Sequence, residues 1–256
     1  ASICPGDLAR PLDGFSLKVS NGTDTVDSVS VTFPAGVVAG LSQVEITDNA
    51  GGVVYGLSTT LADTTLVNLA SPINVTTSTV NYRVRVTPKT QATMPSPGAR
   101  YDLSAQVTAV GCFSDTLLQD GDSASVVLDD EAPAAPVLNA NLLDSRIDLS
   151  WSNTGTGVVL LRDTAPLTDF VPAEGSTYST GDTFGSARVV YAGTNTSHGD
   201  ASAVNGTTYY YALFAYDGCK NYSPAGASGP PTPKGTTTVG DGTDPGNANL
   251  CPGDAA

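Results

Sequence analysis

The chain has 256 residues, of which 40% are hydrophobic, 27 are Gly and 17 are Pro, so it is long enough for one or two compact domains rich in turns. Its 11 Lys and Arg against 25 Asp and Glu give a formal net charge of −14, which would repel a phosphate backbone and excludes nucleic acid as a partner. No window approaches the roughly 18 consecutive apolar residues of a membrane span. The chain has a single His, the commonest general acid or base of enzymes, so we expect no enzyme.

The first half of the chain carries short runs in which apolar and polar side chains alternate. This period of two is typical of half-buried antiparallel strands, and no window has a convincing helical period. Asn21-Gly22, Asp48-Asn49 and Gly51-Gly52 supply turns beside these runs. The clearest runs are 15–19, 29–33, 82–86 and 103–107. Many short strands punctuated by Gly and Pro predict a β-sandwich over residues 1–130.

The strand pattern stops at a proline-rich acidic segment, which we take as a linker over residues 131–136. A second series of strands begins at Ile147 and closes near Pro233, so we place a second sandwich at 137–234. Residues 235–256 form a Gly-, Asp- and Pro-rich tail with too few apolar side chains for a core of its own. The predicted fold is therefore all-β, with two tandem β-sandwich domains and an irregular C-terminal tail.

Two segments of the second half resemble strands of fibronectin type III domains. Leu149-Ser150-Trp151 is similar to that family's second strand, whose Trp fills the centre of the sandwich, and residues 206–217 are similar to its sixth strand. The resemblance covers roughly residues 135–234 and implies that Tyr209 is the corner tyrosine. It also implies that Tyr211, Leu213 and Ala215 point inward. An insertion-like stretch from Asp163 to Gly185 departs from the family's middle strands.

Residues 11–130 resemble, more loosely, the immunoglobulin-like modules that accompany such domains in secreted bacterial surface proteins. The linker Asp-x-x-Ala-Pro-Ala-Ala-Pro, which ends at Pro136, is common in those arrays. A fold of this kind implies an extracellular or cell-surface location but no specific function.

The four cysteines, Cys4, Cys112, Cys219 and Cys251, have no Cys-x-x-Cys spacing, and one His does not complete a zinc site, so we expect disulfides in an oxidising compartment. In an immunoglobulin-like sandwich the loop before the last strand lies at the same end as the N-terminus. The resemblance therefore implies the pairs Cys4–Cys112 and Cys219–Cys251. A bond from Cys4 to Cys251 would contradict this pairing.

Acidic residues gather at the linker, where Asp129, Asp130 and Glu131 are consecutive. Ca²⁺ binds six to eight oxygens from such loops. In a fibronectin-like topology the strand before Asp217 ends facing the linker. These four residues are our candidate calcium site, with solvated acidic loops and no cofactor as the alternative.

The resemblance places Tyr210, Phe214 and Tyr216 on the outward face of their strand as an aromatic row. Exposed aromatic patches usually mark contacts, so our first reading is a partner-binding surface. Glycan stacking and cover by the chain's own loops are the alternatives. Separately, Asn-x-Ser/Thr triplets occur at five asparagines, as such triplets often do by chance in a Thr-rich chain: Asn21, Asn74, Asn195, Asn205 and Asn221.

Together these features predict an extracellular structural or adhesive protein, a subunit of a surface filament or pilus-like assembly. Its partners would be copies of itself or other filament subunits, with the tail 235–256 packed on a neighbour. The alternative is a carbohydrate-binding module of a secreted protein, which would bind a glycan through the aromatic row. A hydrolase that uses a carboxylate pair is a third hypothesis, which sequence spacing does not test.

Overall fold

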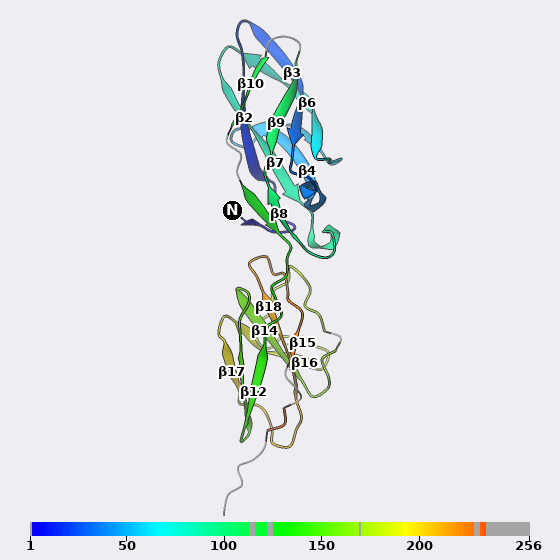
Figure 1. Cartoon of the computed structure of the whole chain (residues 1–256), viewed down its shortest axis with the longest axis vertical. Coiled ribbons are helices and arrows are strands. Elements are labelled where there is room, and N and C mark those ends of the chain that lie inside the picture. The colour runs from blue at the N-terminus through cyan, green and yellow to red at the C-terminus, as the bar shows by residue number, and fades with distance from the viewer. Residues whose placement is uncertain (1, 113–115, 122–124, 169, 228–230, 234–256) are drawn as a thin grey trace, which may run out of the picture.

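The computed structural model describes residues 2–112, 116–121, 125–168, 170–227 and 231–233. Nearly all regular structure in these ranges is β-strand, and the strands form two sandwiches that follow each other along the long axis (Figure 1). The predicted all-β fold is confirmed. The predicted tail, residues 235–256, lies outside the described residues.

The first sandwich comprises β1 to β11 and two short 3₁₀ helices, η1 and η2. Their bounds are β1 Ser2–Ile3, β2 Arg10–Val19, β3 Thr23–Thr32, η1 Val37–Gly40, β4 Leu41–Asp48, β5 Val54–Ser58, β6 Thr64–Thr76, β7 Val80–Pro88, η2 Gln91–Thr93, β8 Arg100–Leu103, β9 Gln106–Cys112, β10 Thr116–Asp120 and β11 Val126–Asp129.

Two sheets make up the first sandwich. One has the order β10-β2-β7-β4-β5-β6-β3-β9, and the other has the order β1-β11-β8. The alternation seen in the sequence places one face of each strand inward: Phe15, Leu17 and Val19 of β2 are each at most 2% exposed. A single hydrophobic core runs from Ile3 to Leu128.

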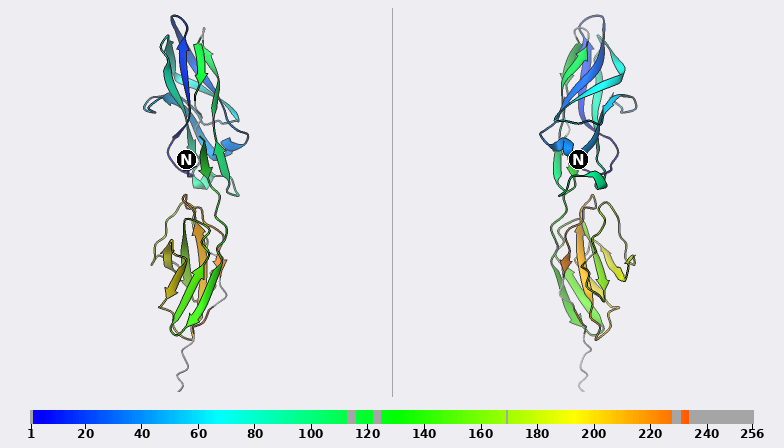
Figure 2. Two further views of the ribbon diagram at one scale, coloured as in Figure 1. Left: turned by 60° about the vertical axis from the view of Figure 1, so that its left-hand side comes forward. Right: turned by 90° about the vertical axis from the view of Figure 1, so that its right-hand side faces the viewer.

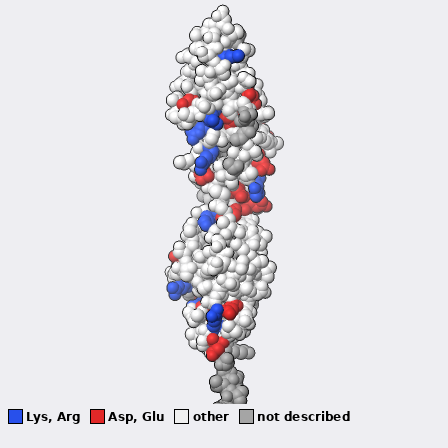
Figure 3. Space-filling view, turned by 90° about the vertical axis from the view of Figure 1, so that its left-hand side faces the viewer, with Lys and Arg blue, Asp and Glu red and all other residues white. Residues whose placement is uncertain are grey.

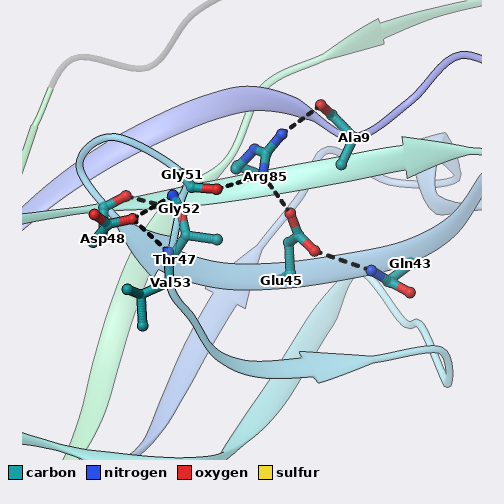
Figure 4. Close-up of polar contacts among 9 residues, drawn as sticks. All are labelled: Ala9, Gln43, Glu45, Thr47, Asp48, Gly51, Gly52, Val53 and Arg85. Carbon is teal, nitrogen blue, oxygen red and sulfur yellow. Dashed lines mark hydrogen bonds and ion pairs between the residues drawn. The ribbon is translucent and has the colours of Figure 1, made fainter.

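Polar contacts hold the turn between β4 and β5 against the neighbouring strand β7 (Figure 4). The Asp48 carboxylate accepts the backbone N–H groups of Gly52 and Val53 at 2.7 and 2.9 Å. Arg85 of β7 pairs with Glu45 of β4 at 2.9 Å. Both acids therefore have structural roles: Asp48 accepts the N–H groups that close the turn, and Glu45 ties β4 to β7 through a largely buried ion pair.

The second sandwich contains β12 to β19. Their bounds are β12 Leu138–Leu143, β13 Arg146–Trp151, β14 Gly157–Asp163, β15 Thr183–Phe184, β16 Ala187–Gly193, β17 Ser197–Asp200, β18 Tyr210–Tyr216 and β19 Gly226–Ala227. The sheet β12-β13-β17 faces the sheet β15-β16-β14-β18-β19. This is the strand arrangement of immunoglobulin and fibronectin type III sandwiches, with Trp151 on the second strand.

The residues that carry the fibronectin resemblance lie where it implied. Trp151, Tyr211, Leu213 and Ala215 all belong to the core between the two sheets. The Tyr209 hydroxyl accepts the backbone N–H of Val204, five residues upstream, at 3.0 Å. The corner tyrosine is therefore confirmed.

Replacing Tyr209 by Phe removes the oxygen that accepts the Val204 N–H. We expect a loss of about 1 kcal/mol in the free energy of unfolding of the second sandwich. Trp151 is the only Trp of the chain, so its fluorescence during denaturant unfolding reports on this sandwich. Tyr210→Phe is the control, and an equal loss in that variant would contradict a specific role of the corner.

Candidate functional site at the domain junction

A disulfide crosses from one sandwich to the other. Cys4, which follows β1, is bonded to Cys219, which lies in the turn after β18, with the two Cα atoms 5.2 Å apart. The bond joins residues 215 positions apart in the chain. The facing ends of the two sandwiches are thus linked twice, by the peptide linker and by this bond.

Parallel pairing of β1 brings Cys4 to the junction. Ser2 pairs with Val127 and Ile3 with Leu128, so β1 runs in the same direction as β11, which leads into the linker. Beyond Cys4 the chain turns back through Gly6, whose φ of 83° suits glycine and whose N–H donates to the Lys89 carbonyl at 2.8 Å. Cys4 is thereby held at the end of the first sandwich that faces the second.

The predicted pairs Cys4–Cys112 and Cys219–Cys251 are wrong. Arg100 at the start of β8 pairs with Asp129 at the junction, so the chain runs away from the junction through β8 and β9. Cys112, at the end of β9, is exposed toward the opposite end of the sandwich. The topological argument failed because β1 joins β11 in parallel, which reverses the end at which Cys4 emerges. Cys251 lies outside the described residues.

A buried asparagine forms a second bridge between the sandwiches. The Asn221 side chain is 1% exposed, and its Nδ2 donates to the backbone carbonyl of Asp129 at 3.1 Å and to Asp217 Oδ2 at 2.9 Å. Asp217 Oδ1 in turn accepts the backbone N–H groups of Cys219 and Asn221 at 2.9 and 3.0 Å. One turn therefore presents both the half-cystine and the amide to the first sandwich.

Sequence reasoning missed the part that Asn221 plays. Asn221-Tyr222-Ser223 is one of the five Asn-x-Ser/Thr triplets, but a side chain at 1% exposure is not accessible to a glycosylating enzyme. The available signal was Asp217 itself, because an Asp side chain in a turn often accepts the backbone N–H two residues on, here that of Cys219. Such a turn places Asn221 next to the same carboxylate.

The four candidate calcium ligands lie at the junction, where protein donors occupy several of their oxygens. Asp130 is 6% exposed and accepts Gln91 Nε2 at 2.7 Å. Asp129 Oδ1 accepts the N–H of Glu131 at 3.4 Å. The Asp217 carboxylate accepts the two N–H groups of the turn described above. Within the described ranges, no three or more His, Cys, Asp or Glu side chains are grouped to hold a metal ion. Calcium binding stays a prediction from the sequence.

Negative charge is nevertheless concentrated here, as the red side chains at the waist of the molecule show (Figure 3). Burial raises the pKa of the Asp130 carboxyl, and the charges of Asp129 and Asp217 raise it further. Burial also raises the pKa of Glu174, whose Oε2 accepts the Tyr222 N–H at 3.0 Å. A cleft of about 530 Å³ at the junction is lined by Asp130, Glu131 and Glu174 together with four prolines and other residues.

The predicted aromatic row divides into one covered and two partly exposed residues. Tyr210 and Tyr216 are partly exposed, and Lys220 Nζ lies 3.6 Å from the centre of the Tyr216 ring. Phe214 lies on the outward face of the sheet, as expected, but it is only 2% exposed, so the expectation that it is exposed is wrong. Phe170 and Phe184 cover it, with ring centres of Phe170 and Phe214 5.7 Å apart. The insertion-like stretch after β14 thus supplies the cover that we had kept as an alternative.

Comparisons with known proteins give distant structural similarities. No family model and no curated protein matches the chain. Among solved structures it is similar to a β-1,2-glucanase from Parabacteroides distasonis, at 15% identity and TM-score 0.29, covering 86% of this chain and 30% of that one. It is also similar to domains A168-A170 of titin, at 8% identity and TM-score 0.34, covering 81% and 67% of the two chains.

A third similar structure is that of the fibronectin(III)-like modules of Clostridium thermocellum CbhA, at 13% identity and TM-score 0.28, covering 82% of this chain and 86% of that one. These likenesses concern the fold alone. The assignment to all-β sandwiches of the immunoglobulin and fibronectin type rests on the sheets described above. Within the described residues, no helix has the length and apolar character to span a membrane.

Cleavage after Glu131 gives a direct check of the disulfide. Glu131 is exposed in the linker and Glu174 is exposed in the loop after β14, whereas Glu45 is 6% exposed, so a glutamate-specific protease should cut after Glu131 and Glu174. We expect the fragment that ends at Glu131 to stay joined to the fragment that contains Cys219 on a non-reducing gel, and the two to separate after reduction. Separation without reductant would contradict the Cys4–Cys219 bond.

Replacing Asn221 by Ala should leave the Asp129 carbonyl and the Asp217 carboxylate without their shared donor. We expect the free energy of unfolding to fall by about 1 to 3 kcal/mol, the cost of unsatisfied buried acceptors. Asn195→Ala, at an exposed position in the same sandwich, is the control. Equal denaturation midpoints for the two variants would contradict the view that the Asn221 side chain stabilises the junction.

Proposed function

We propose that this chain is an extracellular structural module, a stiff two-domain segment of a surface filament or pilus-like adhesive assembly. The observation that carries the proposal is the disulfide between Cys4 and Cys219, which joins two sandwiches that have separate cores. A bond in this place constrains the angle between domains, which is what a load-bearing segment requires and a pair of independent binding domains does not.

The chemistry of the junction supports an extracellular location. Disulfides persist in oxidising environments and are rare in the cytosol. The bond closes a loop of 215 residues, for which the loop-entropy relation gives about 5 kcal/mol of stabilisation. A bond of this kind restricts the unfolded chain and, in the folded chain, opposes hinge motion at the linker.

The polar contacts reinforce the same angle between the domains. Asn221 ties the turn of the second sandwich to the last residue of β11, immediately before the linker. Thr154 donates a hydrogen bond from its hydroxyl to the Ala134 carbonyl within the linker. Both donors belong to the second sandwich, which therefore holds the chain just before the linker and within it. The views in Figure 2 agree with an elongated arrangement in which the sandwiches meet only at their ends.

Exposed apolar side chains on the first sandwich support contacts with other subunits. Val53, Val54, Leu57 and Leu66 are 45 to 57% exposed and come from β5, the residue before it, and the neighbouring strand β6. Copies of the same chain, or other filament subunits, would cover them. The burial of Phe214 removes the centre of the aromatic row on which the carbohydrate-binding alternative depended.

Electron microscopy of the native material tests the proposal. We expect wild-type protein in filaments with regularly spaced, straight segments. The double variant Cys4→Ser/Cys219→Ser should give bent or irregular segments, because only the linker peptide and the hydrogen bonds of the junction then fix the angle between the two sandwiches. A chain ending at residue 236 should remain as single rods if the tail packs on a neighbour.

Cys112→Ser, far from the junction, is the matched control and should leave segment geometry unchanged. Wild-type protein that stays as single particles at high concentration would overturn the filament proposal. Straight segments in the double variant would overturn the role given to the disulfide.

A further inference from the structure

A buried carboxyl lies inside the first sandwich, away from the junction. The register of β2 against β7 shifts between Pro11 and Asp13, so that Leu12 at 0% and Asp13 at 2% exposure are both turned inward. Asp13 Oδ1 accepts the N–H of Gly14 at 2.8 Å. Its Oδ2 atom is buried, and the described part of the chain offers it no hydrogen-bond donor. An orphan buried carboxylate oxygen is costly unless it carries a proton.

Asp120, the last residue of β10, pairs with Phe15 of β2, so it lies beside the segment that carries Asp13, and its carboxylate interacts with that of Asp13. Asp120 Oδ1 also accepts the backbone N–H of Val107 in β9 at 3.1 Å. The next residue, Gly121, donates its N–H to the Gly14 carbonyl at 2.7 Å. Strands β10 and β9 are the two ends of the eight-stranded sheet, so these contacts close the sheet on itself at one seam.

The charged groups of the neighbouring strand are already engaged. Arg83 of β7 donates its Nε to the Asn49 carbonyl at 2.9 Å. Arg85 of β7 pairs with Glu45 and donates to the Ala9 carbonyl, as Figure 4 shows. Asp120 is the charged group that acts on Asp13 among the residues described, and it is negative. Burial, and then repulsion by Asp120, raise the pKa of Asp13 to about 6.

We propose that Asp13 and Asp120 share one proton, which closes the seam between β2, β10 and β9 at mildly acidic pH. The protonated Asp13 donates through Oδ2 to the Asp120 carboxylate, which continues to accept the Val107 N–H. Loss of the proton to solvent turns this donation into repulsion between two carboxylates. The end strands β9 and β10 then separate more readily, which makes the first sandwich a pH-sensitive element of the protein.

The sign of the pH effect follows from linkage. The folded chain keeps the Asp13 proton up to about pH 6, whereas the unfolded chain releases it near the ordinary value of 3.8. Between these values the folded state binds more protons, so stability falls as the pH rises. The contribution is fully present below the lower value and is lost above the upper one.

Thermal unfolding between pH 4.5 and 7.5 tests the proposal, together with hydrogen exchange of the Val107 amide. We expect the wild-type Tm to fall from pH 4.5 to about 6 and then to level off, and the protection of the Val107 amide, relative to its intrinsic exchange rate at each pH, to fall over the same range. Asp13→Asn carries a permanent donor, so both changes should disappear, with the Tm at pH 7.5 raised by roughly 3 °C or more. Asp24→Asn is the control, since Asp24 is similarly buried at 6% exposure, and it should keep the wild-type pH dependence.

Asp120→Asn provides a second variant in case the first does not fold, and it should reduce the same pH dependence, because burial alone then raises the pKa of Asp13. An unchanged slope of Tm against pH in both variants would overturn the proposal. So would a wild-type Tm at pH 7.5 that rises with Ca²⁺ and falls with chelator while Asp13→Asn responds to neither. In that case a cation, and not a proton, occupies the space between the two carboxylates.

Discussion

The covalent bond between Cys4 and Cys219 is the constraint on which the arrangement of the two domains depends. It forms because β1 pairs with β11 in parallel and therefore delivers Cys4 to the end from which the linker leaves. The turn after β18 presents Cys219 at the facing end of the second sandwich. A two-residue strand thus decides which cysteines meet, and with them whether two domains behave as one body.

The carboxylates around this bond are held by protein donors. Buried negative charge is unfavourable unless hydrogen bonds compensate it, and here Gln91 serves Asp130 while the Asn221 amide serves Asp217. Burial, and then repulsion by neighbouring carboxylates, raises the pKa values of Asp130 and Glu174. The same physics recurs at Asp13, where another carboxylate takes the place of a donor. Buried acidic side chains therefore lie at two kinds of contact in this protein: between the two domains at the junction, and between β2, β9 and β10 in the first sandwich.

The segment after β14 gives the second sandwich a layer that its strand order does not require. Phe170, Tyr178 and Phe184 pack over the outer face of the sheet and make a second small core with Phe214 and Tyr222. Edge-to-face aromatic pairs of this kind add to the apolar area that they bury. The layer also brings Glu174 close to the turn that carries Cys219, so the insertion contributes to the junction as well as to the core.

The sequence by itself determined the features that depend on local pattern. Period-two alternation identified the all-β class, and the residues of the fibronectin resemblance located Trp151 and the corner Tyr209, because a side chain's face on a strand follows from its position alone. Only the tertiary structure decided the disulfide partners, the cover over Phe214 and the bridge through Asn221. Each depends on which segments far apart in the chain meet, and Cys4 reached Cys219 through the direction of one strand pairing that no local pattern encodes.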